Sequence, residues 1–321
     1  MKSMRTGYNK IIIKIGFSIL FLTYIIAKID LRLFAETIST IRLDYYFISF
    51  IIAIFNSVVL AQKYKIVMQP SGIYQPLTNL VKINFICRFY SMFLTSAVGQ
   101  SVIRWHLSTK HQEGRLQFII VMIFERSSFF FALFSAVLIS FPLVSDINAT
   151  IIAGYIYPLL AAGLVMLSLF YLYLILAPIY NRINRILLNG KKNINSAWIS
   201  NVYDFIRTFS IYHNKKKTLI TSLGLAFVGH FLFLLRVYLL VFSVQVSLSF
   251  LQIMWMASLV LLIQVLPISL NGIGLREASY AFLFRIQDLP SESGVLIGIL
   301  IFSQMFVMSF LGGILHLSSK D

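Results

Sequence analysis

The sequence predicts an all-α membrane protein: a polytopic bundle of transmembrane helices with six full spans and two oppositely directed, re-entrant or broken helical hairpins. The first observation is composition, because 59% of the 321 residues are hydrophobic and only 12% are charged, whereas a soluble domain has about 25% charged residues. The second is that the hydrophobic residues gather in runs of the length that crosses a bilayer. The single cysteine, Cys87, also excludes an internal disulfide. Soluble, disordered and disulfide-stapled folds therefore do not fit.

Six uninterrupted runs meet the requirement of about 17 to 25 mostly apolar residues for a spanning helix. These spans are expected near residues 11–29, 45–62, 117–141, 150–177, 218–243 and 292–316. The first follows Lys2, Arg5 and Lys10 and so resembles a signal peptide. No small-residue cleavage site follows it, and we therefore expect a retained anchor. No connection is long enough for a soluble domain, so we expect one transmembrane domain over residues 1–321.

Two further apolar stretches are interrupted by charged or helix-breaking residues. The first, near 78–104, contains Lys82 and Arg88, and the second, near 250–287, is broken by Pro267 and a Gly-rich turn. Loops rich in Lys and Arg stay in the cytoplasm. By this rule both ends of each interrupted stretch lie on the same side of the membrane, and the two stretches start from opposite sides. We therefore expect two opposed re-entrant elements, with two ordinary extra spans as the alternative. Paired interrupted segments point to the binding site of a transporter.

The net charge of +16 comes from basic residues in the loops that this rule places in the cytoplasm. We therefore expect a multi-pass protein of the cell membrane with both termini cytoplasmic and with no nucleic-acid partner. The connection 178–217 is expected to be a cytoplasmic amphipathic segment on anionic lipid, with packing against the bundle as the alternative. Its apolar residues at near-helical spacing are Trp198, Ile199, Val202, Phe205, Ile206 and Phe209. The composition, rich in Ile, Lys and Asn, indicates an AT-rich, prokaryotic genome.

Charged residues in the middle of a span need a reason, because each costs at least about 2.5–3.5 kcal/mol there. Glu125 and Arg126 lie near the middle of the expected 117–141 span. Adjacent helix residues point about 100° apart, so the two should not simply pair with each other. Either they form buried ion pairs that lock helices together, or Arg126 faces an anionic group in a polar cavity.

The second interrupted stretch carries another candidate site. Pro267 and the glycines after it predict a break followed by a short helix from about Leu275. Such a helix directs free N–H groups at the break, which is a general way to hold an anion, and the alternative is a purely structural break. The candidate substrate-binding residues here are Ser269, Asn271, Gly272, Gly274, Arg276 and Glu277.

Arg104 is the matching candidate in the first interrupted stretch, where it follows a glycine and two polar residues. For Arg104 and Arg88 the alternative is snorkelling to the headgroups. His230 and Arg236 are six residues apart and on different faces of one span, so we expect no shared site. The second tier of binding candidates is Arg88, Gln100, Ser101 and Arg236.

The usual signatures of an enzyme are missing. The five histidines have no metal-ligand spacing, and the few acidic residues are too scattered for a paired-carboxylate site. No phosphate-binding loop or dinucleotide fingerprint occurs. We therefore expect no metal, no cofactor and no catalytic residue.

The stretch Leu266–Ala278, Leu-Pro-Ile-Ser-Leu-Asn-Gly-Ile-Gly-Leu-Arg-Glu-Ala, resembles the hallmark of the lysylphosphatidylglycerol synthase transmembrane-region family, also called the flippase-like family. Glu125-Arg126 resembles the acidic–Arg pair that this family has in a middle helix, and Leu311–Ile314 resembles its final Gly-Gly segment. The resemblance extends over essentially the whole chain.

One segment departs from the family pattern. Ala97–Arg104 resembles the hydrophobic-Gly-Gly-Asp-x-x-Arg segment, but Gln100 replaces the second Gly and Ser101 replaces the Asp. The resemblance implies a polytopic domain that moves lipids between leaflets, among them polyprenyl-linked sugars, cardiolipin-like lipids and hopanoids in stand-alone members. In the larger synthases a soluble aminoacyltransferase follows this region. No such domain fits in this sequence, so we do not expect lysyl transfer.

We therefore expect a flippase or transporter-like protein in which Arg104, Arg126 and Arg276 hold the anionic headgroup of a membrane lipid. The alternatives are an intramembrane glycosyl or aminoacyl transferase with Glu125 or Glu277 as base, or an accessory scaffold. A second copy of the chain or an enzyme of lipid synthesis would be the protein partner. To keep the empty site near neutrality, we expect Glu125 to pair with Arg276 and Glu277 to pair with Arg126.

Overall fold

In the computed structural model the chain is a bundle of helices, and no strand occurs among the described residues. The structure describes residues 32, 36, 38–92, 97–109, 115–143, 150–176, 212, 215–266, 268–269 and 271–318. The predicted all-α class is confirmed. The expected first span near 11–29, the apolar residues of the 178–217 connection and Pro267 lie outside the described residues.

Within the described part of the chain, four helices are long and apolar enough to cross a membrane, and they lie where uninterrupted apolar runs predict spans. They are α3 (Leu43–Met68), α6 (Arg115–Ser140), α10 (Lys216–Ser243) and α13 (Ser291–Ser318). A further helix, α7 (Thr150–Leu176), occupies the expected 150–177 run. Helices of 26 to 28 residues are about 39–42 Å long at 1.5 Å per residue, which exceeds the ~30 Å hydrocarbon core.

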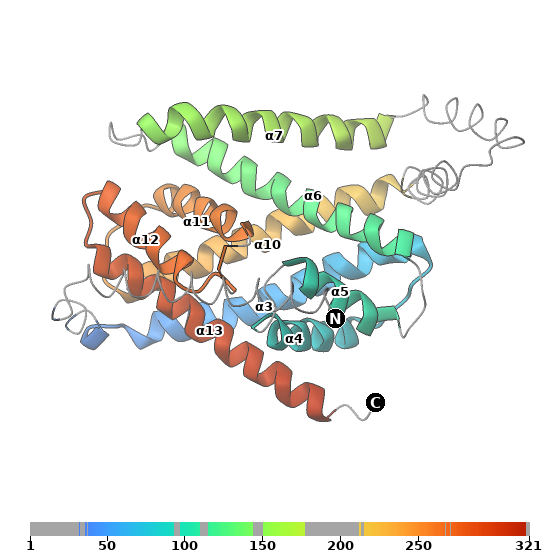
Figure 1. Cartoon of the computed structure of the whole chain (residues 1–321), viewed down its shortest axis with the longest axis horizontal. Coiled ribbons are helices and arrows are strands. Elements are labelled where there is room, and N and C mark those ends of the chain that lie inside the picture. The colour runs from blue at the N-terminus through green and yellow to red at the C-terminus, as the bar shows by residue number, and fades with distance from the viewer. Residues whose placement is uncertain are drawn as a thin grey trace, which may run out of the picture.

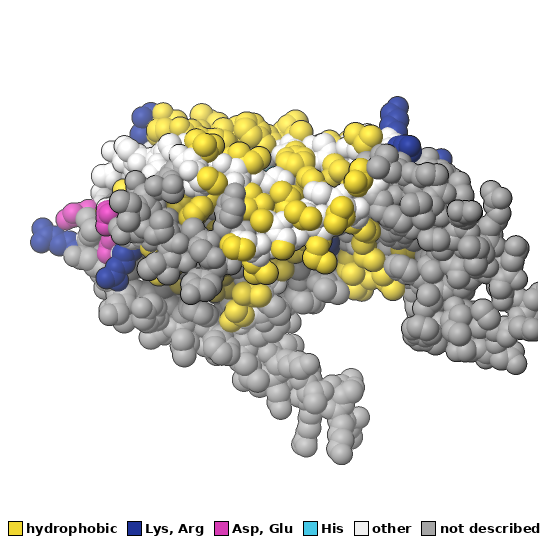
Figure 2. Space-filling view, turned by 90° about the horizontal axis from the view of Figure 1, so that it is seen from above, with side chains coloured by type: hydrophobic (Ala, Val, Ile, Leu, Met, Phe, Trp, Pro, Cys, Tyr) yellow, Lys and Arg dark blue, Asp and Glu magenta, His cyan; other side chains and the backbone are white. Residues whose placement is uncertain are grey.

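The described surface is largely apolar around the middle of the bundle, and the charged side chains visible from above gather mainly at its two ends (Figure 2). Large hydrophobic side chains are exposed on the outward faces of the long helices. They include Phe47, Ile51 and Phe55 of α3 and Phe306 and Phe310 of α13. Contiguous apolar surface of this extent is unfavourable in water but not in hydrocarbon, so the bundle is suited to a lipid surrounding.

The long helices pack side by side, with α3 along α10, α6 across α10, and α7 outside α6 (Figure 1). One buried apolar cluster, centred on Met256, Val260 and Ile297, joins α10, α13 and the second interrupted stretch. A second cluster, which includes Leu80 and Ile120, joins α3, α6 and the first interrupted stretch. The two interrupted stretches are therefore built into the core of the bundle.

Each interrupted stretch forms two short helices that pack against one another. The first consists of α4 (Leu77–Ser91) and α5 (Ala97–Thr109), and the second of α11 (Phe250–Val265) and α12 (Leu275–Ile286). The start of α12 lies where the Gly-rich break predicts it, with Gly274 as the N-cap. Asn271 (φ 50°) and Gly272 (φ 77°) also adopt left-handed backbone in this turn, a conformation that Gly and Asn tolerate best.

Glycines on α13 allow the two interrupted stretches to approach it closely. A β-carbon at Gly294 would lie 2.7 Å from the carbonyl oxygen of Tyr280 in α12, and one at Gly312 would collide with the carbonyl group of Phe85 in α4. Gly294 and Gly312 are 18 residues apart, which is about 27 Å along the helix. The helices α12 and α4 therefore lie against opposite ends of α13.

Replacing Gly312 with alanine is expected to destabilise the protein by about 1–3 kcal/mol or more, because the added carbon overpacks the contact between α4 and α13. Gly224→Ala on α10 is the matched control, since no atom lies within 4 Å of a β-carbon there. The better helix propensity of alanine should make this control neutral or slightly stabilising. Thermal unfolding of both variants in detergent checks the prediction, and equal melting temperatures would contradict the close approach of α4.

Candidate functional site

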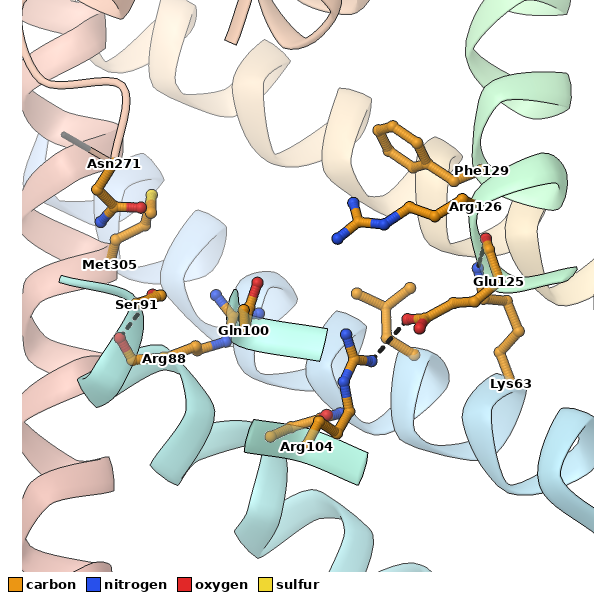
Figure 3. Close-up of a pocket in the computed structure, with 12 residues that line it drawn as sticks. Lys63, Arg88, Ser91, Gln100, Arg104, Glu125, Arg126, Phe129, Asn271 and Met305 are labelled. Carbon is orange, nitrogen blue, oxygen red and sulfur yellow. Dashed lines mark hydrogen bonds and ion pairs between the residues drawn. The ribbon is translucent and has the colours of Figure 1, made fainter. Parts of the chain in front are cut away.

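A cavity of about 290 Å³ lies inside the bundle, where α3, α4, α5, α6 and α13 meet (Figure 3). Its lining residues are Leu60, Lys63, Asn84, Arg88, Ser91, Gln100, Arg104, Glu125, Arg126, Phe129, Asn271 and Met305. Ser91 at the end of α4 and Gln100 in the first turn of α5 come from the first interrupted stretch, and Asn271 comes from the second. The two stretches that the sequence singles out therefore meet at one cavity.

The cavity lies far from the ends of the long helices that form it. Met305 is the fifteenth of the 28 residues of α13, and Arg126 is the twelfth of the 26 residues of α6. Each is thus at least about 15 Å from the nearer end of its helix. In a helix that crosses a bilayer this depth falls within the hydrocarbon region, where every charged side chain needs a partner or a function.

Glu125 is held by cations from two other helices. The Nη1 atom of Arg104 in α5 donates to Glu125 Oε1 at 2.6 Å. The Nζ atom of Lys63 in α3 donates to the backbone carbonyl of Glu125 at 3.2 Å and to Ser128 Oγ at 3.3 Å. Because the Arg104 guanidinium also lies over the ring of Tyr64, 4.8 Å from its centroid, it is buried in the bundle and does not snorkel. These contacts join α3, α5 and α6 at the cavity wall.

Two further arginines point at the same space. Arg126 Nη2 donates to Ser101 Oγ at 3.2 Å, and Arg88 Nη2 donates to Ser57 Oγ at 3.1 Å. Figure 3 shows the guanidinium groups of Arg88, Arg104 and Arg126 directed toward the cavity from different sides. Guanidinium groups present several fixed donors that match the oxygens of phosphate or carboxylate. The arrangement is therefore suited to an anion.

Arg276 and Glu277 form an ion pair beside the cavity rather than in its lining. Arg276 Nη2 and Nε donate to Glu277 Oε1 at 2.9 and 3.1 Å, and Glu277 Oε2 accepts from the amide of Gly274 at 2.7 Å. The Arg276 side chain is 1% exposed, lies over the ring of Phe302 in α13 and contacts the sulfur of Met305. Glu277 thus caps α12, and Arg276 connects that capped end to α13.

The expected pairing of the buried charges is wrong. Glu125 does not pair with Arg276, because its partner is Arg104. Glu277 pairs with the adjacent Arg276 instead of with Arg126. Helix capping is the physical reason: Glu277 turns back toward the start of α12, and this brings its carboxylate within reach of the long neighbouring side chain.

Several other candidates lie outside the cavity lining. Ser269, Gly272 and Gly274 belong to the turn before α12, where the hydroxyl of Ser269 is buried and has no hydrogen-bond partner in the described part of the chain. Ser101 is connected to the lining through its hydrogen bond with Arg126. These residues shape the second interrupted stretch or orient a lining side chain.

The second-tier candidate Arg236 belongs to a separate buried network. Its Nε donates to Gln304 Oε1 at 2.7 Å and its Nη2 to the carbonyl of Ile301 at 3.1 Å. His230 shares a hydrogen bond of 2.9 Å with Ser258 Oγ in α11. As their spacing predicts, Arg236 and His230 have different partners and form no common site.

A family model described as the lysylphosphatidylglycerol synthase TM region matches residues 11–313. The chain belongs to this family. Searches of curated proteins and of solved structures found no match. In this lysylphosphatidylglycerol synthase TM-region protein, the hallmark stretch Leu266–Ala278 places Asn271 on one side of the cavity, and Glu125-Arg126 lies on the other (Figure 3).

Ser101, where the sequence departs from the pattern that it resembles, lies beside the cavity. The resemblance places an Asp there, whereas the hydroxyl of Ser101 accepts a hydrogen bond from Arg126. A carboxylate at the same position would add a negative charge next to the Arg126 guanidinium. The hydroxyl of Ser101 adds no such charge.

Three polar lining residues of the TM-region protein were not among the candidates: Lys63, Asn84 and Ser91. Lys63 follows the expected 45–62 span and counts there as a loop residue, but α3 continues past it and leaves it only 3% exposed. One signal was available, because Lys63 lies seven residues after the polar Asn56 and so on the same helix face.

The described lining of the cavity supplies cationic hydrogen-bond donors suited to an anion. Among the described residues, no group of three His, Cys, Asp or Glu side chains could hold a metal ion. Glu125 is the one carboxylate among the described lining residues, and its Oε1 atom is engaged by Arg104.

Proposed function

We propose that this protein moves the anionic headgroup of a membrane lipid between the two leaflets through the cavity between its interrupted stretches. The observation that carries the proposal is the lining itself. Among the described lining residues are four cations, Lys63, Arg88, Arg104 and Arg126, and one carboxylate, Glu125, at a depth that corresponds to the hydrocarbon region. Both interrupted stretches contribute to this lining, as expected of a transporter site.

The physical role of such a cavity is to lower the barrier of desolvation. An isolated charge transferred from water into hydrocarbon loses its hydration and gains nothing in return. Guanidinium and ammonium groups inside the bundle replace that hydration, while the acyl chains of the lipid remain in the surrounding bilayer. Asn84, Gln100 and Asn271 add neutral hydrogen-bonding groups around the same space.

The arrangement on α13 supports a re-entrant form for both interrupted stretches. The contact of Gly294 with α12 and that of Gly312 with α4 lie near opposite ends of this long helix. With the basic loops in the cytoplasm, we propose that α4 and α5 enter the membrane from the cytoplasmic face and α11 and α12 from the other. The cavity then lies where the two elements meet.

Arg276 has a different role in this proposal from the one that the sequence predicts. Because it is buried beside Glu277 and α13, it positions the α11–α12 turn and does not bind the headgroup. Arg104 and Arg126 keep the headgroup-binding role. Transport is favoured over a transferase reaction because neither Glu125 nor Glu277 is free of an arginine.

Reconstitution into liposomes tests this function. Fluorescent phosphatidylglycerol should change leaflet faster with the protein than in empty liposomes, as measured by quenching of the outer leaflet. Arg126→Gln should slow the movement about tenfold or more, because a charge-assisted hydrogen bond contributes roughly 1.5–3 kcal/mol. Lys65→Gln, which removes a cation from α3 outside the cavity lining, should keep the wild-type rate. Movement no faster than in empty liposomes for any anionic lipid would refute the proposal.

A further inference from the structure

The charges that line the cavity do not balance. Four cationic side chains and one anionic side chain occur among the described lining residues, a formal excess of three positive charges (4 − 1). The ion pair between Arg104 and Glu125 at 2.6 Å neutralises one cation. Lys63 and Arg88 donate to neutral oxygens, namely a backbone carbonyl and the hydroxyls of Ser128 and Ser57. The site therefore holds more positive charge than a singly charged ligand can match.

Burial makes this excess costly. Lys63 is only 3% exposed, and a buried cation beside neutral oxygens retains much of its desolvation cost. Like charges also repel strongly where the dielectric constant is low. A phosphodiester, with one negative charge, would leave two of the three excess charges uncompensated. A terminal phosphate or a diphosphate would come much closer to neutrality.

The geometry favours the same class of ligand. The guanidinium groups of Arg88, Arg104 and Arg126 approach the open space from different sides (Figure 3). A terminal phosphate has three outer oxygens to meet such donors, whereas a diester has two. The volume of about 290 Å³ is close to that of roughly ten water molecules at ~30 Å³ each. This space is large enough for a terminal phosphate or a diphosphate.

We infer that the cavity takes a headgroup with two or more negative charges, a terminal phosphate or a diphosphate, in preference to a singly charged phosphodiester. The inference rests on the proposed function and specifies the chemistry of its substrate. Arg104 and Arg126 already have the headgroup-binding role in the proposed function. Lys63 and Arg88 set the preference, because they add two further lining cations, and their hydrogen bonds go to neutral oxygens.

Binding of two matched lipids to the purified full chain in uncharged detergent tests the inference. Phosphatidate and phosphatidylglycerol with identical acyl chains differ in headgroup charge at pH 7, where a phosphomonoester carries about −1.5 to −2. We expect phosphatidate to bind at least about tenfold more tightly by native mass spectrometry or ligand-induced thermal stabilisation. Equal binding, or tighter binding of phosphatidylglycerol, would overturn the inference.

Variants assign the preference to particular residues. Lys63→Gln and Arg88→Gln should each reduce the phosphatidate-to-phosphatidylglycerol affinity ratio several-fold, and the double variant should bring it close to one. Lys65→Gln on α3 and Lys82→Gln on α4 are matched controls, because they remove a cation from the same helices outside the cavity lining. These controls should leave the ratio unchanged. A double variant that keeps the wild-type ratio would refute the assignment.

Binding of inorganic pyrophosphate and orthophosphate is measured last, to distinguish a lipid ligand from a free anion. A lipid ligand is expected to compete with pyrophosphate and to bind more tightly than it, because the acyl chains add apolar contact. If pyrophosphate binds with the same charge preference but no lipid moves in liposomes, the proposed function fails and the charge preference stands. If phosphatidylglycerol moves in liposomes while the affinity ratio is one, the function stands and this inference fails.

Discussion

Replacing Arg276 with glutamine is expected to destabilise the protein by about 3–5 kcal/mol and to abolish lipid movement. The reason is that Glu277, which is 4% exposed, would remain as a buried carboxylate without its cation. The turn that carries Asn271 into the cavity would also lose its connection to α13. Chemical or thermal unfolding in detergent measures the stability, and the liposome assay measures transport.

Arg285→Gln is the matched control for this variant, because Arg285 lies on the same helix, α12, with an exposed side chain. It should change stability by less than about 0.5 kcal/mol. The double variant Arg276→Gln/Glu277→Gln should recover most of the lost stability, since glutamine at residue 277 can still cap α12. If Arg276→Gln proves as stable as Arg285→Gln, the ion pair does not hold this turn in place.

Glu125→Gln is expected to have the opposite signature: tighter lipid binding together with slower transport. In the empty site Glu125 occupies Arg104 at 2.6 Å, so an anionic headgroup must compete with it. Removal of the competing charge frees Arg104 for the headgroup and should increase affinity about tenfold, or 1.4 kcal/mol. Release then becomes slower, because the carboxylate no longer displaces the bound anion. Retained lipid in native mass spectra and the liposome rate report the two effects separately.

Asp288→Asn is a suitable control for Glu125→Gln, because it removes one negative charge from an exposed position outside the cavity lining. Asparagine also tolerates the positive φ of 53° found there. This variant should leave both lipid retention and transport unchanged. Faster transport by Glu125→Gln, with no gain in retained lipid, would show that the carboxylate does not compete with the substrate.

The positions of the long helices follow from local features of the sequence. In a bilayer each backbone polar group must be satisfied within its own helix, so the length of an apolar run is enough to predict a span. This rule placed α3, α6, α10 and α13. The positive-φ turn before α12 was predictable for another local reason: glycines adopt backbone conformations that other residues avoid. Leu275 is accordingly the first residue of α12.

The sequence also singled out most of the charged lining residues, since a charge within an apolar run is conspicuous wherever it points. Arg88, Arg104, Glu125 and Arg126 all line the cavity. It did not single out Lys63, because the apolar run ends before that residue although the helix does not. The end of an apolar run marks where the hydrophobic residues stop. The helix itself can continue further, as long as its hydrogen bonds and packing allow.

The pairing of the buried charges, in contrast, depends on how the helices pack. Partner choice depends on the rotation and offset of packed helices and on the reach of long side chains, and neither quantity is encoded in residue spacing along one chain segment. Arg104 reaches Glu125 because α5 and α6 both border the cavity. Arg276 stays with Glu277 because the capped end of α12 holds that carboxylate close to it. Composition and spacing thus specify the helices and their unusual charges, and packing specifies the site.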